Sequence, residues 1–131
     1  MQDPSRLRVF RTAERVALEV YRLTRGFPLE ERFGLAQQMR RAAVAIGSDI
    51  AEGCGRSGAR DFARFLEMAL GSAAELQFRL RIAHRSGSVD AADCDATAND
   101  LHQVHRMLIR LIKRVRPASG ASRGRPKTDS R

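Results

Sequence analysis

The sequence predicts an all-α protein: an antiparallel up-down-up-down four-helix bundle followed by a disordered basic tail. Hydrophobic residues make up 43% of the 131 residues, which is enough for a buried core, and Ala and Leu dominate them. This composition favours helices over a β-sandwich, which needs more β-branched and aromatic residues. Apolar residues recur at three- and four-residue spacing in four long segments, and short breaks join these segments. Short connections predict that consecutive helices are antiparallel neighbours.

The first two helices are expected over residues 5–24 and 30–53. The first ends before the breaker Gly-Phe-Pro at residues 26–28, and the second ends in a glycine-rich turn at residues 54–58. Gly47 is costly inside a helix, so it predicts a bend or a close contact in the second segment. The residues expected to face the core recur at helical spacing: Val9, Phe10, Ala13, Val16, Ala17, Val20, Tyr21, Leu23, Leu35, Met39, Ala42, Ala43, Ile46 and Ile50.

The third and fourth helices are expected over residues 59–85 and 91–116, on either side of Ser-Gly-Ser at residues 86–88. Asp90 is the expected N-cap of the fourth helix, and Asp93 suits the positive end of its dipole. The residues of these two helices expected to face the core are Phe62, Phe65, Leu66, Ala69, Ala73, Leu76, Leu80, Ala83, Leu101, Val104, Leu108, Leu111, Ile112 and Val115.

The formal net charge of +9 is concentrated at the C-terminal end. Residues 1–105 carry 15 basic and 14 acidic side chains, whereas residues 106–131 carry nine basic and one acidic. Residues 117–131 contain no large apolar residue, so they cannot bury enough surface to offset the entropy of ordering. We therefore expect a bundle domain over residues 1–116 and a disordered basic tail over residues 117–131, which is a polyanion-binding candidate.

Two helix faces carry rows of cations that acids do not interrupt, apart from Asp100. Rows of Arg at helical spacing can contact successive phosphates, so they indicate nucleic acid, with RNA expected first. Such contacts would be independent of sequence, and one Tyr with no Trp argues against base stacking. The alternative is an arginine-rich surface without a ligand. The candidate nucleic-acid-binding residues are Arg8, Arg11, Arg15 and Arg22 in the first helix, and Arg106, Arg110, Lys113 and Arg114 in the fourth.

Small residues in the second and third helices predict that these two helices form the closest pair. Phe78 and Ile82 lie four residues apart on the third helix, away from its core face. One interpretation is a partly exposed pair of the kind that many surfaces carry. The other is a subunit interface.

The sequence offers little catalytic chemistry, so we expect no enzyme, no cofactor and no metal. Two imidazoles, in His102-x-x-His105, could share a metal only with further ligands such as Cys94 or Asp100. Cys54 has no base paired with it in the sequence. Two cysteines cannot form a disulfide framework. With neither a signal peptide nor a membrane span, a cytoplasmic location is expected.

Two blocks of the chain resemble a bacterial four-helix bundle family, first noted as open reading frames within intervening sequences of 23S rRNA genes. The resemblance covers residues 7–115. The chain differs from the family at three positions: Gly47, where Pro is usual, Asp49, where Asn is usual, and Phe10, where Trp is common. The blocks that carry it are Phe27-Pro28, Phe33-Gly34-Leu35, Arg40-Arg41-Ala42-Ala43-Val44 and Ile50-Ala51-Glu52-Gly53, then Phe62, Phe65-Leu66, Ala69, Gly71-Ser72 and Glu75-Leu76.

The resemblance implies a homopentamer without known catalytic activity. A divergent branch serves diversity-generating retroelements, where a basic pentamer binds the reverse transcriptase and nucleic acid. This chain resembles that branch only in size, charge and predicted fold. The alternative function, from another class, is a protein–protein adaptor, such as an accessory subunit for a reverse transcriptase or a ribosome-associated factor, which would leave Phe78 and Ile82 free after self-assembly. We interpret the residues of these blocks as structural. The charged ones would form ion pairs where helices meet, and the small ones would allow close packing. The candidate assembly residues are Arg40, Arg41, Glu52, Gly53, Gly71, Ser72 and Glu75, with Phe78 and Ile82.

Overall fold

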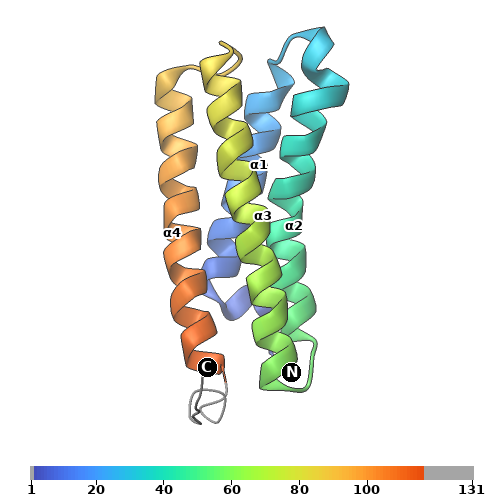
Figure 1. Ribbon diagram of the computed structural model, residues 1–131, viewed down its shortest axis with the longest axis vertical. Helices are drawn as coiled ribbons and strands as arrows, with labels where there is room; N and C mark the ends of the chain where they lie inside the picture. The colour runs from blue at the N-terminus through green and yellow to red at the C-terminus, as the bar shows by residue number, and fades with distance from the viewer. Residues whose placement is uncertain (1, 117–131) are drawn as a thin grey trace, which may run out of the picture.

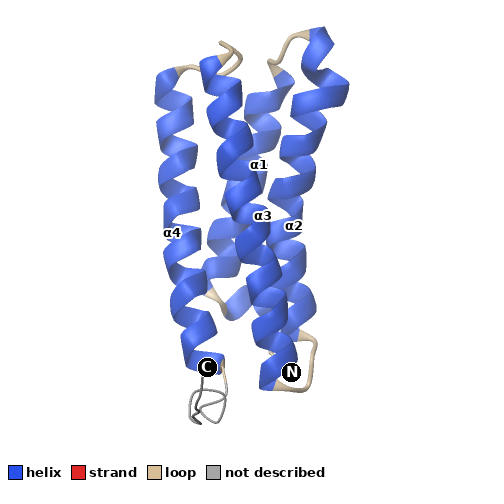
Figure 2. Ribbon diagram, in the orientation of Figure 1, coloured by secondary structure: helices blue, strands red, loops and turns tan. Residues whose placement is uncertain are grey.

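The computed structural model describes residues 2–116, and within them four long helices pack side by side (Figure 1). The helices are α1 (Arg8–Arg25), α2 (Gln37–Cys54), α3 (Ala59–Arg85) and α4 (Ala91–Val115). Each helix contacts the next one along the chain, and α1 also contacts α4, so the four enclose one core. The described residues contain no strand (Figure 2). The predicted antiparallel bundle is confirmed.

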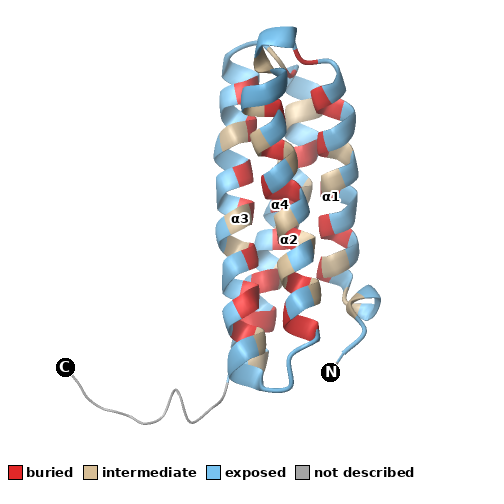
Figure 3. Ribbon diagram, turned by 90° about the vertical axis from the view of Figure 1, so that its right-hand side faces the viewer, coloured by how far each residue is buried: buried red, intermediate tan, exposed pale blue. Residues whose placement is uncertain are grey.

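Most residues that helical spacing placed inward are buried, and Figure 3 shows the buried positions along the inner sides of the helices. Tyr21, which was expected to face the core, is 40% exposed, and Phe62 and Val115 are only half-buried. Helices α2 and α3 make the most extensive contact of any pair, as their small residues predicted. The largest fully buried side chains come from all four helices: Val16, Val20, Met39, Ile46, Ile50, Leu66, Leu76, Leu80, Thr97, Val104 and Leu108.

The chain before α1 differs from the prediction of a helix from residue 5. Pro4–Arg6 form a separate 3₁₀ turn, because Asp3 Oδ1 accepts a hydrogen bond from the Ser5 amide at 3.0 Å and caps it. The Gln2 amide donates to the Cys54 carbonyl at 3.0 Å. The N-terminal segment is thereby held against the C-terminal end of α2.

The α1–α2 connection also differs from the prediction of a helix from residue 30. Leu29–Glu31 form a 3₁₀ turn and Arg32–Ala36 a π-helical turn, so regular α-helix begins only at Gln37. Phe27 is buried and anchors the connection to the core. Phe33, in the π turn, is 81% exposed.

Three local features lie near the connections between α2, α3 and α4. A Cβ on Gly53 would lie 3.0 Å from both Phe62 Cδ1 and Phe65 Cβ, so this glycine lets α2 and α3 approach closely. Gly87 has a φ of 89°, which reverses the chain after α3. Asp90 Oδ1 accepts from the Asp93 amide at 2.8 Å, so the predicted N-cap is confirmed.

The predicted disordered tail, residues 117–131, lies outside the described residues. None of the helices in residues 2–116 has the length and apolar character of a membrane span.

Candidate nucleic-acid interface

Helices α1 and α4 lie side by side and run antiparallel, so the N-terminal end of α1 is next to the C-terminal end of α4 (Figure 1). The predicted basic row of α1 therefore lies beside part of the row on α4. All eight cations of the two rows are exposed. Arg106 and Lys113 are exposed on α4 but do not line the groove that Arg110 and Arg114 share with α1.

Three of the predicted arginines converge on one groove at this end of the bundle. Arg8 of α1 and Arg110 and Arg114 of α4 line a groove of about 130 Å³, which we call the basal groove. Apolar side chains, including Leu7 and Leu111, line the rest of it. Within residues 2–116, none of the three arginines has a carboxylate within 4.0 Å. The basal groove is therefore a concentrated positive site that an anion can enter.

The other half of the α1 row is neutralised, which corrects the prediction of an uninterrupted stripe. Arg15 donates two hydrogen bonds to Asp100 of α4, at 3.2 and 3.1 Å. Arg22 pairs with Asp93 of α4 at 3.0 Å and also with Glu19. The partners on α4 are far away in the sequence and are brought near only by the bundle.

These ion pairs keep both guanidiniums charged and occupied. The hydrogen bonds that Arg15 donates to Asp100 raise the pKa of Arg15, and those that Arg22 donates to Glu19 and Asp93 raise the pKa of Arg22. A bidentate guanidinium–carboxylate pair leaves fewer donors for a phosphate. Arg15 and Arg22 are therefore weaker candidates for nucleic-acid contact than Arg8, Arg110 and Arg114.

The helix dipoles act differently on the two sides of the basal groove. Lys113 and Arg114 occupy the last turn of α4, where cations are stabilised by the negative end of the dipole. Arg8 is the first residue of α1, whose first turn holds no acidic residue, so its charge adds to the positive end of that helix. Arg11 donates to the Ser5 carbonyl at 3.0 Å and stays at the same end. A phosphate near Arg8 would offset this accumulation of positive charge.

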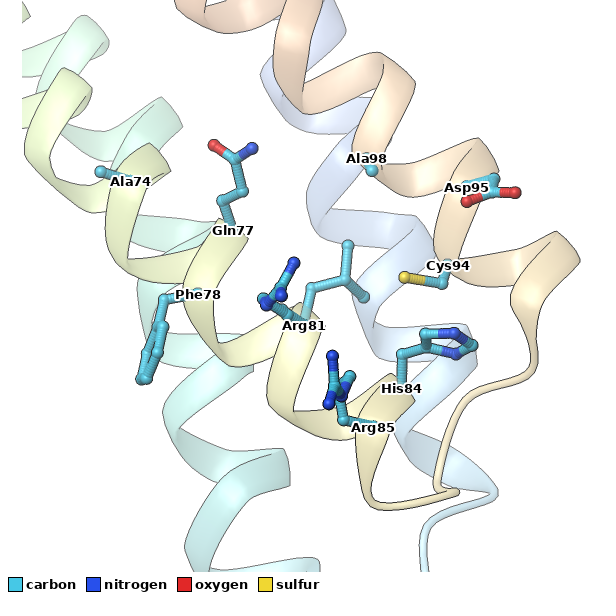
Figure 4. Close-up of a pocket in the computed structure, with 10 residues that line it drawn as sticks. Ala74, Gln77, Phe78, Arg81, His84, Arg85, Cys94, Asp95 and Ala98 are labelled. Atoms are coloured by element: carbon cyan, nitrogen blue, oxygen red, sulfur yellow. The ribbon is translucent and has the colours of Figure 1, made fainter.

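A second cationic groove, of about 600 Å³, lies between α3 and α4 near the C-terminal end of α3 (Figure 4). Arg81 and Arg85 project together over it, and neither has a carboxylate within 4.0 Å among the described residues, although Asp95 also lines the groove. The sequence reading missed these two arginines. Their four-residue spacing on the outer face of α3 was a signal that could have found them.

The described residues offer no arrangement suited to nucleophilic or metal chemistry. Burial, with Asp95 nearby, raises the pKa of the Cys94 thiol, and burial raises that of Cys54, so both thiols favour the protonated form. His84 Nδ1 lies 3.1 Å from the Val89 carbonyl and helps to close the α3–α4 turn. No three His, Cys, Asp or Glu side chains in residues 2–116 are grouped to hold a metal ion.

The sequence profile described as "23S rRNA-intervening sequence protein" matches residues 5–110. The chain belongs to this family. One similar solved structure is a protein with unknown function from the S23 ribosomal protein family of Bacteroides thetaiotaomicron. It is 24% identical, with a TM-score of 0.75, over 80% of this chain and 95% of that one. At this identity the likeness shows a shared fold. No protein of curated function matches.

Within residues 2–116, the charged residues of the family signature form no ion pair between helices. Glu52 pairs with Arg56 at 2.9 Å and Glu75 with Arg79 at 3.0 Å, in each case one turn further along the same helix. Within the subunit the expectation of ion pairs between helices is therefore not met, because the helix surface offers each acid an arginine four residues away.

Arg40 connects α1 and α2 in a different way. Its Nε donates to Thr24 Oγ1 at 2.7 Å, and its guanidinium stacks 4.8 Å from the centroid of the Tyr21 ring. Thr24 is buried, so this contact ties the end of α1 to the first turn of α2. Arg41 is exposed and has no carboxylate within 4.0 Å among the described residues.

The small signature residues behave differently from one another. Gly53 makes the close approach to α3 described above. A Cβ on Gly71 would meet nothing within 4 Å, so close packing inside the subunit does not explain this glycine. Ser72 is half-buried. Phe78 and Ile82 are 62% and 41% exposed, so the subunit itself leaves them uncovered.

Proposed function

We propose that this member of the 23S rRNA-intervening sequence protein family is a non-enzymatic, self-associating bundle that binds nucleic acid, RNA foremost. The basal groove carries this proposal. Three arginines without carboxylate partners meet there, and Arg11, Arg106 and Lys113 are exposed around it. Arg is the side chain best suited to hydrogen-bond phosphate oxygens.

The contacts available in the basal groove favour backbone recognition over base recognition. The guanidiniums can contact phosphates, while the rest of the lining is apolar and holds no Asn or Gln side chain that could hydrogen-bond to the edges of bases. The binding is therefore expected to be tolerant of sequence and steeply dependent on salt. The family description, which refers to 23S rRNA, makes rRNA fragments the first nucleic acids to test.

The experiment compares binding of mixed-sequence RNA and duplex DNA by fluorescence anisotropy at increasing salt. Replacement of Arg106, Arg110, Lys113 and Arg114 by Gln should weaken binding without unfolding the protein, because all four side chains are exposed. Circular dichroism checks the fold of the variant. Absence of binding at low salt, or an affinity that does not respond to salt, would refute the proposal.

Self-association is the second part of the proposal, and the homopentamer implied by the family resemblance is the stoichiometry we expect. Phe78 and Ile82 lie one turn apart on α3 and are both exposed, and this supports association because neighbouring exposed apolar side chains mark protein–protein interfaces. Light scattering that finds a monomer at micromolar concentration would refute this part.

A protein–protein adaptor is the alternative function, and the exposed apolar side chains of the α1–α2 connection favour it. Leu29 and Phe33 are 68% and 81% exposed at one end of the bundle, away from the basal groove. A partner protein that remains bound after nuclease treatment, and is lost in Phe33→Ser, would favour the adaptor function over nucleic-acid binding.

A further inference from the structure

The two cationic grooves lie on opposite flanks of α4, near its two ends. Arg110 and Arg114 line the basal groove on the flank beside α1. Ala98 lines the other groove on the flank beside α3, across from Arg81 and Arg85 (Figure 4). We call this second groove the upper groove. Helix α4 therefore lines both grooves, and its outer face lies between them.

One row of residues on α4 leads from the basal groove to the upper groove. Its members are four residues apart, and four residues turn about 400°, so each lies about 40° further round the helix than the one before. From residue 114 to residue 98 the row winds about 160° round α4 and rises about 24 Å. Its middle members are exposed, so it crosses the outer face and not the core. The row consists of Arg114, Arg110, Arg106, His102 and Ala98.

The side chains of this row can hold a phosphate backbone. Its three arginines have no carboxylate within 4.0 Å among the described residues, so their guanidiniums are free to donate to phosphate oxygens. His102 is exposed, and its ring N–H is a further donor. Ala98 carries only a methyl group, which leaves space where the row meets the upper groove.

The upper groove gives this row an end with room for a ligand. Its volume of about 600 Å³ is in the range of small-molecule sites, so it can hold a nucleotide. Arg81 and Arg85 lie one turn apart and can donate to the same phosphate or to neighbouring ones. Asp95 also lines the groove and would repel a phosphate there. Phe78 lies at the edge and points away from α4, so a self-contact at Phe78 does not require the two arginines (Figure 4).

The curvature of the row separates single strands from duplexes. A duplex has a persistence length of about 150 base pairs, whereas the row turns about 160° round a helix about 10–12 Å across. One backbone of a duplex cannot follow such a turn. A single strand is flexible enough to do so, and cationic grooves that follow the backbone are typical of proteins that bind single strands.

We propose that α4 carries a continuous path for single-stranded nucleic acid, from the basal groove along the four-residue row to a nucleotide held by Arg81 and Arg85 in the upper groove. The inference rests on the proposed nucleic-acid binding and specifies the form of nucleic acid and a second contact site. The contacts are to phosphates, so the path is tolerant of sequence. A duplex would contact the basal groove without reaching Arg81 and Arg85.

The test measures binding by fluorescence anisotropy at increasing salt. One probe is labelled oligouridine of about 16 nucleotides, the upper end of common single-strand site sizes, and the other is a labelled RNA duplex of the same length. Arg81→Gln/Arg85→Gln removes the contact in the upper groove. Arg25→Gln/Arg60→Gln is the matched control, because these two arginines are exposed and line neither groove. Circular dichroism checks that both variants fold.

The upper-groove variant should lose about 1.4 from the slope of log K against log salt on the single strand, relative to the control, because each phosphate contact there contributes about 0.7. On the duplex, the two variants should have equal slopes. Asp95→Asn should strengthen binding of the single strand by up to about fivefold, the effect of unit charges about 4 Å apart in water.

The outcomes separate this inference from the function that underlies it. If the wild type binds oligouridine but the upper-groove variant keeps the slope of the control, the path is wrong and nucleic-acid binding stands. An equal loss of slope on strand and duplex also overturns the path, since the two strands of a duplex would then straddle α4. A wild type that binds neither probe overturns both the path and the proposed function.

Discussion

Replacement of Gly53 by Ala tests the closest approach between two helices in the bundle. The new Cβ would lie 3.0 Å from Phe62 Cδ1 and 3.0 Å from Phe65 Cβ. The half-buried Phe62 ring can turn away, but Phe65 Cβ is fixed to the backbone of α3. Relief at Phe65 therefore requires α2 and α3 to separate.

The magnitude follows from two opposing terms. Exchanging Gly for Ala inside a helix stabilises it by about 1 kcal/mol. Forcing an extra methyl group into a packed contact costs about 1–3 kcal/mol. We expect Gly53→Ala to lower the free energy of unfolding by about 1 kcal/mol net, and to lower Tm by about 4 °C for a domain of this size.

Gly71→Ala is the matched control, because a Cβ there meets nothing within 4 Å of the same subunit. It should raise the free energy of unfolding by about 1 kcal/mol. Urea denaturation of both variants is measured at several protein concentrations, so that a contribution from association would show as a concentration dependence. If Gly53→Ala stabilises the protein as much as Gly71→Ala does, the close contact between α2 and α3 is wrong.

Three further predictions follow from individual side chains. Thr97 is fully buried and its Oγ1 has no hydrogen-bond partner among the described residues, so Thr97→Val should raise stability by about 1 kcal/mol in urea denaturation. Burial, followed by the nearby Glu52, raises the pKa of Asp49, so its ionisation costs stability as pH rises above its unfolded pKa of 3.8. Asp49→Asn should therefore be more stable at pH 7, with the gain disappearing below that pKa, and an equal gain at both extremes would contradict the burial argument. Asp100→Asn releases Arg15 and should add about 0.7–0.9 to the salt slope of nucleic-acid binding, whereas an unchanged slope would mean that Arg15 does not reach the ligand.

Local signals in the sequence predicted local structure well. The Asp90 cap, the breaks around residues 26–28 and 54–58 and the buried faces all depend on neighbours within a few residues, so they could be read without the fold. The starts of α1 and α2 were less accurate. A capped 3₁₀ turn at Pro4–Arg6 and a π turn at Arg32–Ala36 have the same spacing of apolar residues as an ordinary first helical turn.

The candidate interface was predicted in part, because a helical wheel shows one helix at a time. The helical wheels correctly placed both rows of cations on exposed faces. They could not show that Asp93 and Asp100 of α4 meet Arg22 and Arg15 of α1, since those pairs depend on the register between two helices distant in the sequence. The same limit applies to the basal groove, where Arg8 and Arg114 become neighbours only in the folded bundle.

Glycines show the same division between local and tertiary information. Gly53 and Gly71 are both helical and both belong to the signature of the family, yet one lies against two phenylalanines and the other meets nothing. The composition and the spacing of the sequence do not distinguish these two glycines. Only the positions of neighbouring helices separate a glycine that packs inside the subunit from one that is free for an outside contact.

The salt dependence of nucleic-acid binding tests the central claim, that the basal groove contacts phosphates. Arg8→Gln/Arg110→Gln/Arg114→Gln is compared with Arg25→Gln/Arg32→Gln/Arg60→Gln, a control that removes the same charge from exposed arginines outside the groove. The groove variant should lose about 2–3 from the slope of log K against log salt on duplex DNA, because each phosphate contact contributes about 0.9. The control should keep the wild-type slope. Equal slopes for the two variants would contradict the account, since binding would then follow net charge and not the basal groove.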